Sequence, residues 1–156
     1  MDLAHLPPAL VRSGRVELWL EMKLPDAEAA KGGRKRRGLV AAHLLKWVEY
    51  QVDTQGRPCE LRYFRDIEGR EVDFVVTEDG APILLVECKS SDREISPALR
   101  YLKVRFPDAQ AWQISAGGRN EYVSPEGIRV APALRLKTCI THCCPVQNTS
   151  GSTRPS

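Results

Sequence analysis

The feature that most constrains the fold is a pair of strand-like runs, residues 70–76 and 83–89, separated by Glu78-Asp79-Gly80. The Asp-Gly pair favours a two-residue hairpin turn, because both residues tolerate the left-handed backbone that such a turn needs. The second run is apolar on both faces through its first four residues, which is typical of a strand that is covered on both sides. The sequence therefore predicts an antiparallel hairpin at the centre of a sheet.

Helical and strand-like patterns flank this hairpin. We predict a helix over residues 39–50, strands over 60–65 and 109–115, and shorter extended pieces near 16–20 and 127–130. A second helix is expected to start at Ser96-Pro97, since Ser suits the cap and Pro the first helical position, and to end at Pro107. The stripe of the first helix is formed by Leu39, Val40, His43, Leu44, Trp47 and Val48. This order predicts an α/β domain with a central mixed sheet that contains the hairpin and is flanked by helices.

The ends of the chain lack these patterns. We expect an irregular segment over residues 1–15, one domain over 16–136 and a disordered tail over 137–156, which is rich in Ser, Thr and Pro. The basic run at 31–37 contains glycines among like charges and predicts an exposed loop. The tail residues Cys139, His142, Cys143 and Cys144 do not have the spacing of a structural zinc site.

Composition excludes several classes of protein. The 156 residues contain no run of about 18 apolar residues, which a membrane-spanning helix would need, and the N-terminus does not resemble a signal peptide. We therefore expect a cytoplasmic protein with no membrane segment. The odd number of cysteines, 5, argues against a disulfide framework. The net charge of +3 is compatible with nucleic acid but does not by itself indicate it.

Polar side chains interrupt the apolar runs of the hairpin at one place. Strand alternation puts Glu87 and Lys89 on one face at the end of the second run, and an antiparallel hairpin brings Asp73 opposite them. Two carboxylates and a lysine suit phosphodiester hydrolysis, because carboxylate oxygens hold Mg²⁺ and an ammonium can orient a water molecule or offset charge on the phosphate. The alternative is structural: Asp73 ends a strand, and Glu87 with Lys89 forms an exposed ion pair.

These residues resemble a known superfamily. The segments 65–75 (Arg65-Asp66, then Gly69 to Val75) and 86–91 are similar to the PD-(D/E)XK, restriction-endonuclease-like superfamily. More closely, they resemble the uncharacterised domain found C-terminal to AAA+ ATPase modules in bacteria and archaea, over residues 16–136. The resemblance implies a restriction-endonuclease-like fold, Mg²⁺ as cofactor, and DNA and an ATPase module as partners. It implies that Asp73, Glu87 and the carbonyl of Cys88 are metal ligands and that Lys89 is the catalytic lysine.

Two departures from that family affect the function. Its first helix commonly starts with an aromatic-Glu-Asn sequence, and Arg37 stands here in the place of that Glu, which inverts the charge. The chain also has no G-x-x-x-x-G-K-[ST] phosphate loop, so we expect a detached or truncated module. The leading hypothesis is Mg²⁺-dependent cleavage of DNA, with phosphate contacts from Arg34, Lys35, Arg36 and Arg37. The alternatives are a non-catalytic accessory or nucleic-acid-binding module and a gene remnant.

Overall fold

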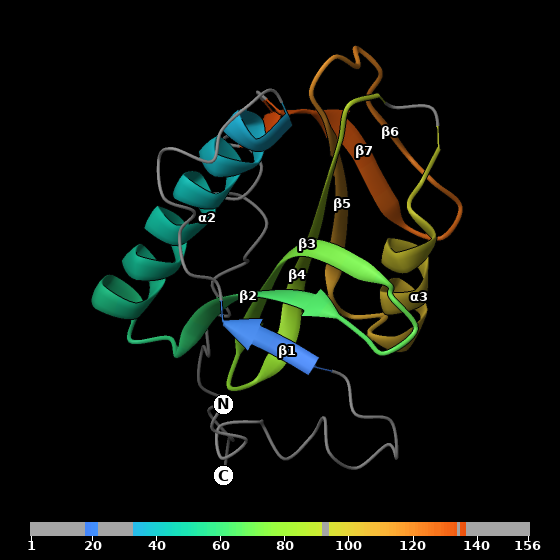
Figure 1. The fold of residues 1–156 in the computed structure, drawn as a ribbon. Coiled ribbons are helices and arrows are strands. Elements are labelled where there is room, and N and C mark those ends of the chain that lie inside the picture. The colour runs from blue at the N-terminus through green and yellow to red at the C-terminus, as the bar shows by residue number, and fades with distance from the viewer. Residues whose placement is uncertain (1–17, 22–32, 92–93, 134, 137–156) are drawn as a thin grey trace, which may run out of the picture.

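A computed structural model describes residues 18–21, 33–91, 94–133 and 135–136 (Figure 1). The expected irregular segment over 1–15 and the expected tail over 137–156, with its cysteines, lie outside the described residues. The helices and strands, in chain order, are β1 (Leu18–Glu21), α2 (Gly33–Gln55), β2 (Cys59–Arg65), β3 (Glu71–Glu78), β4 (Ala81–Lys89), α3 (Pro97–Arg105), β5 (Gln110–Ser115), β6 (Tyr122–Val123) and β7 (Ile128–Pro132). No helix in these ranges is both long and apolar enough to span a bilayer.

The strands form one mixed sheet of seven in the order β1-β2-β3-β4-β5-β7-β6. Neighbouring strands from β1 to β4 are antiparallel, whereas β4, β5 and β7 run parallel. The expectation of a mixed α/β sheet with an antiparallel hairpin is confirmed, and β4 occupies its middle. Because β3 is antiparallel to β4, the start of β3 lies at the same edge of the sheet as the carboxyl ends of β4 and β5.

The turn between β3 and β4 has the predicted chemistry. Its two residues, Asp79 and Gly80, have φ angles of 49° and 78°. Two consecutive positive φ angles are the signature of the type I′ turn, whose twist matches that of the flanking strands. The Asp-Gly pair therefore sets the register of the hairpin.

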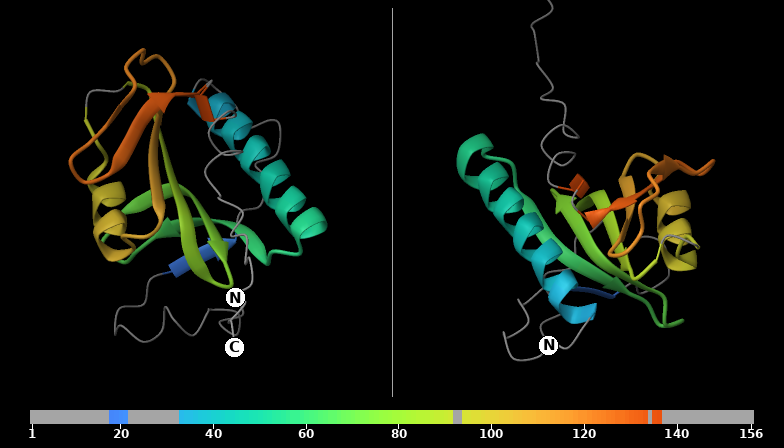
Figure 2. Two further views of the ribbon diagram at one scale, coloured as in Figure 1. Left: turned by 180° about the vertical axis from the view of Figure 1, so that it is seen from behind. Right: turned by 90° about the horizontal axis from the view of Figure 1, so that it is seen from above.

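The two helices cover opposite faces of the sheet (Figure 2). The α2 face contains an apolar cluster to which the helix contributes Val40, Ala41, Leu44 and Val48. The α3 face contains a second cluster, to which that helix contributes Ala98, Leu99 and Leu102. Trp112 and Val86 belong to the first cluster and Leu85 to the second, so β4 is covered on both sides, as its apolar run predicts.

Helix α2 differs from its prediction at the N-terminal end. It begins at Gly33, so the basic run, predicted to be a loop, is helical from that residue onward. Leu39, predicted to be part of the apolar stripe, is 60% exposed. Val40, Leu44 and Val48 of the predicted stripe are buried, and Ala41 joins them. Ala41, Leu44 and Val48 lie 4, 7 and 11 residues after Arg37. Arg37 therefore continues the sheet-facing stripe toward the N-terminus, and Leu39 lies on the opposite side.

Candidate functional site

A β-bulge places Asp73 at the edge of the hairpin. Arg62 pairs with Val75 and Phe64 with Val72, so β3 has one more residue than β2 between these pairs. The extra residue interrupts the alternation, and Val72 joins the α3-side cluster together with Val75. Strict alternation along β3 would group Val72 with Phe74 and Val76, whereas these two belong to the α2-side cluster. Bulges bend a strand and re-aim a side chain, which is what happens to Asp73.

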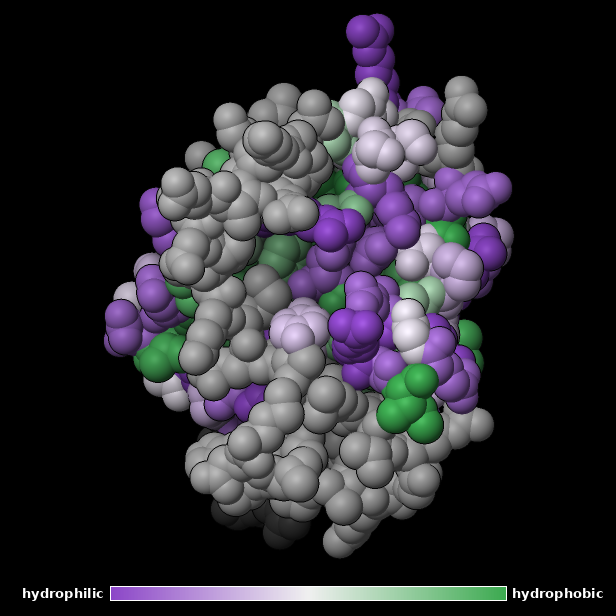
Figure 3. Space-filling model, in the orientation of Figure 1, coloured by the Kyte–Doolittle hydropathy of each residue, from purple (hydrophilic) through white to green (hydrophobic). Residues whose placement is uncertain are grey.

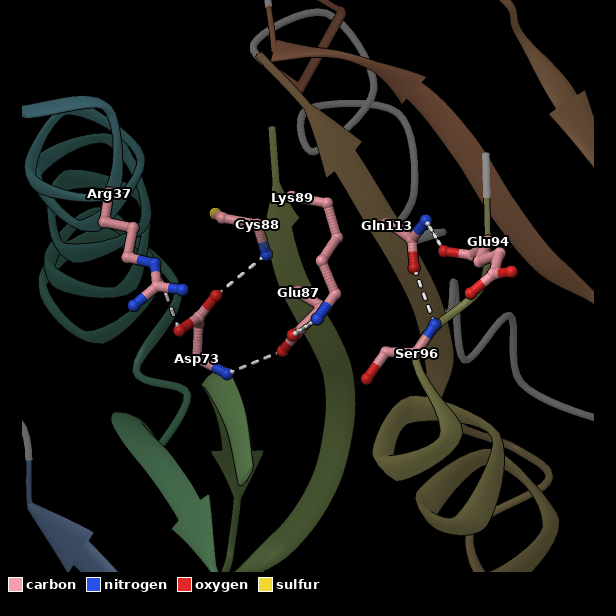
Figure 4. A network of polar contacts seen from close by, with 8 residues as sticks. All are labelled: Arg37, Asp73, Glu87, Cys88, Lys89, Glu94, Ser96 and Gln113. Atoms are coloured by element: carbon pink, nitrogen blue, oxygen red, sulfur yellow. Dashed lines mark hydrogen bonds and ion pairs between the residues drawn. The ribbon is translucent and has the colours of Figure 1, made fainter. Parts of the chain in front are cut away.

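The carboxylates of Asp73 and Glu87 lie side by side where β3 leaves β4 (Figure 4). The last pair in the β3–β4 register is Phe74 with Val86. Beyond it, side chains replace the backbone ladder. The N–H of Asp73 donates to Glu87 Oε2 at 3.2 Å, and the N–H of Cys88 donates to Asp73 Oδ2 at 2.9 Å. The two acidic residues thus hold the ends of the two strands together.

A cation faces each carboxylate. Lys89 Nζ lies 2.9 Å from Glu87 Oε1, and Arg37 Nε reaches from α2 to within 3.4 Å of Asp73 Oδ1. Figure 4 shows Arg37 and the β4 residues on opposite sides of Asp73. The side chains of Glu87 and Asp73 are only 7% and 17% exposed, whereas those of Lys89 and Arg37 are 41% and 54% exposed. The centre is therefore a buried pair of acids with two cations on its solvent side.

Burial raises the pKa of both carboxyl groups. For Asp73, desolvation outweighs the hydrogen bond from the Cys88 N–H and the charges of Arg37 and Lys89. For Glu87, desolvation and the neighbouring charge of Asp73 outweigh the contribution of Lys89. Two like charges that are buried side by side disfavour ionisation of each other. The pair consequently favours a nearby positive charge.

The backbone of Cys88 is the chemically relevant part of that residue. Burial, together with the charges of Asp73 and Glu87, raises the pKa of the thiol to about 12, so the sulfur is protonated at neutral pH and is a poor nucleophile or metal ligand. In a strand, the N–H and C=O of one residue leave on the same side. Since the N–H of Cys88 bonds to Asp73, its carbonyl also faces β3.

The prediction missed Gln113, which is fully buried on β5. It is the register partner of Glu87 in the parallel β4–β5 pair. Its Oε1 accepts the N–H of Ser96 at 2.8 Å, and its Nε2 donates to the carbonyl of Glu94 at 2.7 Å (Figure 4). The available signal was an amide between Trp112 and Ile114, in the middle of β5. Gln113 ties the start of α3 to the sheet beside Glu87.

The other predicted nucleic-acid-binding residues directly precede Arg37 in the sequence. Arg34, Lys35 and Arg36 belong to the first turns of α2, and their side chains fall outside what the structure describes. Hydrophilic residues gather across the middle of the face between α2 and α3 in the view of Figure 3. Within the described ranges, no group of three or more His, Cys, Asp or Glu side chains is arranged to hold a metal ion. Any cation at the centre would thus depend on two carboxylates and main-chain or water oxygens.

Comparisons with known proteins add one finding. A family model described as "Domain of unknown function (DUF4143)" matches residues 37–136. This range begins at Arg37 and includes the hairpin, α3 and all the parallel strands. No curated protein and no solved structure matches the chain.

Proposed function

The chain belongs to the DUF4143 family, and we propose that its sheet is the core of a nuclease-like domain of the PD-(D/E)XK, restriction-endonuclease-like type. The strand arrangement supports this proposal: Asp73 lies on β3 of an antiparallel hairpin, Glu87 and Lys89 lie on β4, and β5 continues the sheet in parallel. The residues are those whose motifs resemble that superfamily. The proposed reaction is hydrolysis of a DNA phosphodiester bond with Mg²⁺.

One observation carries this proposal: two buried acids and a lysine meet at the open end of the hairpin. The donor set fits a hard cation, because carboxylate and carbonyl oxygens are the ligands that Mg²⁺ prefers and it often needs only one or two carboxylates. The guanidinium and ammonium groups beside the acids show that the centre attracts positive charge. Asp73, Glu87 and the carbonyl of Cys88 would hold the ion. When bound, it would polarise the phosphate and acidify a water molecule.

The remaining tasks belong to the chain's own groups. Lys89 has a partly exposed ammonium anchored on Glu87, so it can orient a water molecule or offset phosphate charge from the solvent side. Because the carboxylates are little exposed to solvent, the attraction between their charges and a nearby cation is stronger than it would be in water. The basic residues Arg34, Lys35 and Arg36, at the start of α2, would contact DNA phosphates without reading sequence. An AAA+ ATPase module is the proposed protein partner, on the basis of the family resemblance.

A second candidate function is a non-catalytic accessory or nucleic-acid-binding module derived from such an ATPase-associated protein. The observation that favours it is the ion pair of Arg37 with Asp73. Together with Lys89, Arg37 brings the formal charge of the four side chains to zero when both acids are ionised. In that arrangement the centre needs no metal to balance its charge, and the domain would bind DNA without cutting it.

A nicking assay separates the two functions. Supercoiled plasmid is incubated with Mg²⁺ or Mn²⁺ and the wild type, Lys89→Ala, or the control Lys46→Ala, which removes an exposed lysine from α2. We expect Lys89→Ala to lower the nicking rate about a hundredfold, as for loss of one transition-state donor, and Lys46→Ala to leave it unchanged. Equal inertness of the wild type and Lys89→Ala, with DNA binding retained in EDTA, would refute hydrolysis and support the second function.

A further inference from the structure

Every carboxylate oxygen at the centre already has a donor. Asp73 Oδ2 accepts from the Cys88 N–H, and Glu87 Oε2 accepts from the Asp73 N–H. Glu87 Oε1 faces the ammonium of Lys89 at 2.9 Å, which is a typical charge-assisted distance. Asp73 Oδ1 faces the guanidinium of Arg37 at 3.4 Å, which is longer than that range. The oxygen with the weakest contact is therefore the one that Arg37 covers.

Arg37 can leave this position without disturbing the core. Its side chain is 54% exposed, so water can solvate the guanidinium when it moves away from Asp73. The sheet-facing stripe of α2 is anchored by Ala41, Leu44 and Val48, which are buried independently of Arg37. The donors on the other three oxygens are held more firmly: Lys89 lies on the same strand as Glu87, and the other two donors are backbone N–H groups.

We propose that Arg37 competes with a divalent cation for Asp73 Oδ1, so that the two occupy the centre alternately. The proposal rests on the proposed function, because it assumes that the centre takes up such a cation. A guanidinium beside Asp73 adds a positive charge that repels the incoming ion and occupies the oxygen it would use. Arg37 therefore sets the cation concentration at which the centre fills, and the wild type binds divalent cations weakly.

The test measures cation binding directly, apart from any activity. Mn²⁺ binding to the full chain is measured by electron paramagnetic resonance and by titration calorimetry for the wild type, Arg37→Gln and Arg37→Lys. The matched control is Arg100→Gln, which removes an α3 arginine that is 50% exposed and lies 3.2 Å from Glu126. Thermal unfolding is recorded for each variant to establish that it is folded.

We expect Arg37→Gln to tighten Mn²⁺ binding about tenfold or more, since it removes a like charge beside the ligand oxygens. Arg37→Lys keeps the positive charge and should bind as weakly as the wild type, and Arg100→Gln should match the wild type. Adding Asp73→Asn to Arg37→Gln should abolish the gain. Binding by Arg37→Gln that is no tighter than that of Arg100→Gln would overturn the proposal.

The nicking assay, run on the same variants, keeps this proposal distinct from the proposed function. If Arg37→Gln gains Mn²⁺ affinity through Asp73 and still does not cut DNA, the competition by Arg37 stands and the hydrolytic function fails. If the wild type cuts DNA and Arg37→Gln neither binds Mn²⁺ more tightly nor cuts at lower Mn²⁺ concentration, the hydrolytic function stands and the role of Arg37 fails.

Discussion

Replacement of Gln113 by Leu tests the link between the start of α3 and the sheet at β5, next to Glu87. Leu fills nearly the same volume but can neither accept the N–H of Ser96 nor donate to the carbonyl of Glu94. Ser96 is only 4% exposed, so its N–H has no access to water, and an unsatisfied buried donor costs about 1–3 kcal/mol. Glu94 is exposed, and its carbonyl can turn to solvent at little cost. We therefore expect the free energy of unfolding to fall by about 2 kcal/mol.

Urea denaturation followed by far-ultraviolet circular dichroism measures this loss. Since Gln113→Leu changes the native state locally, the midpoint should fall while the slope of the free energy against urea stays constant. The companion variant Gln113→Glu keeps an acceptor for the Ser96 N–H but places a carboxylate on the register partner of Glu87, in addition to that of Asp73. Its destabilisation should be larger at pH 8 than at pH 5, because like charges on adjacent strands repel each other.

Two results would refute this reasoning. A loss below about 0.5 kcal/mol for Gln113→Leu would mean that the Ser96 N–H has another partner in the folded state. A pH-independent loss for Gln113→Glu would mean that the new carboxylate does not face Glu87.

Three further predictions concern stability. Gly38→Ala should raise the free energy of unfolding by about 0.5–1 kcal/mol in thermal or urea denaturation, because Gly38 lies within α2 and nothing lies within 4 Å of an added Cβ. At Asp66, burial raises the pKa of the carboxyl, but hydrogen bonds from the N–H and guanidinium of Arg70 outweigh it and hold the pKa below 3.8. Stability from this group is present above its unfolded pKa and is lost as the pH falls, so Asp66→Asn should cost about 1–2 kcal/mol at pH 7 and less at pH 3 in urea titrations. The pKa of Glu87 is raised, so its effect on stability has the opposite pH dependence. Its contribution to the free energy of unfolding is present below the unfolded pKa of 4.5 and is lost as the pH rises through the folded pKa. In urea titrations the wild type should therefore lose more stability between pH 4 and pH 8 than Glu87→Gln.

The hairpin was predictable because its signals are local and agree with one another. The Asp79-Gly80 pair determines a two-residue turn, and the turn determines which residues face each other across the two strands. Runs of apolar residues then identify β4 as a strand that is covered on both sides. These short-range rules suffice to bring Asp73 close to Glu87 before any tertiary contact is known.

The bulge in β3 could not be predicted in the same way. Whether Asp73 is paired or extra depends on the register between β2 and β3, which the packing of Phe64 against Val72 and Val75 determines. A strict period of two cannot contain an inserted residue, so the sequence alone assigns Val72 to the wrong face. The start of α2 was missed because its first turn has no acidic residue, which is the local signal that favours a helix N-terminus.

The energetics of the acid pair bear on whether the centre serves stability or chemistry. Glu87 is buried and Asp73 is largely buried, and the pKa of each is raised, so ionising them costs the folded state free energy relative to uncharged side chains. An apolar pair would close the end of the hairpin without that cost, and the strand already supplies the apolar neighbours Phe74 and Val86. Glu87→Gln retains the shape and an acceptor for the Asp73 N–H while it removes the charge. If that variant is more stable than the wild type at pH 8, the charge of Glu87 is not there to hold the hairpin together, and a role in binding a cation explains it.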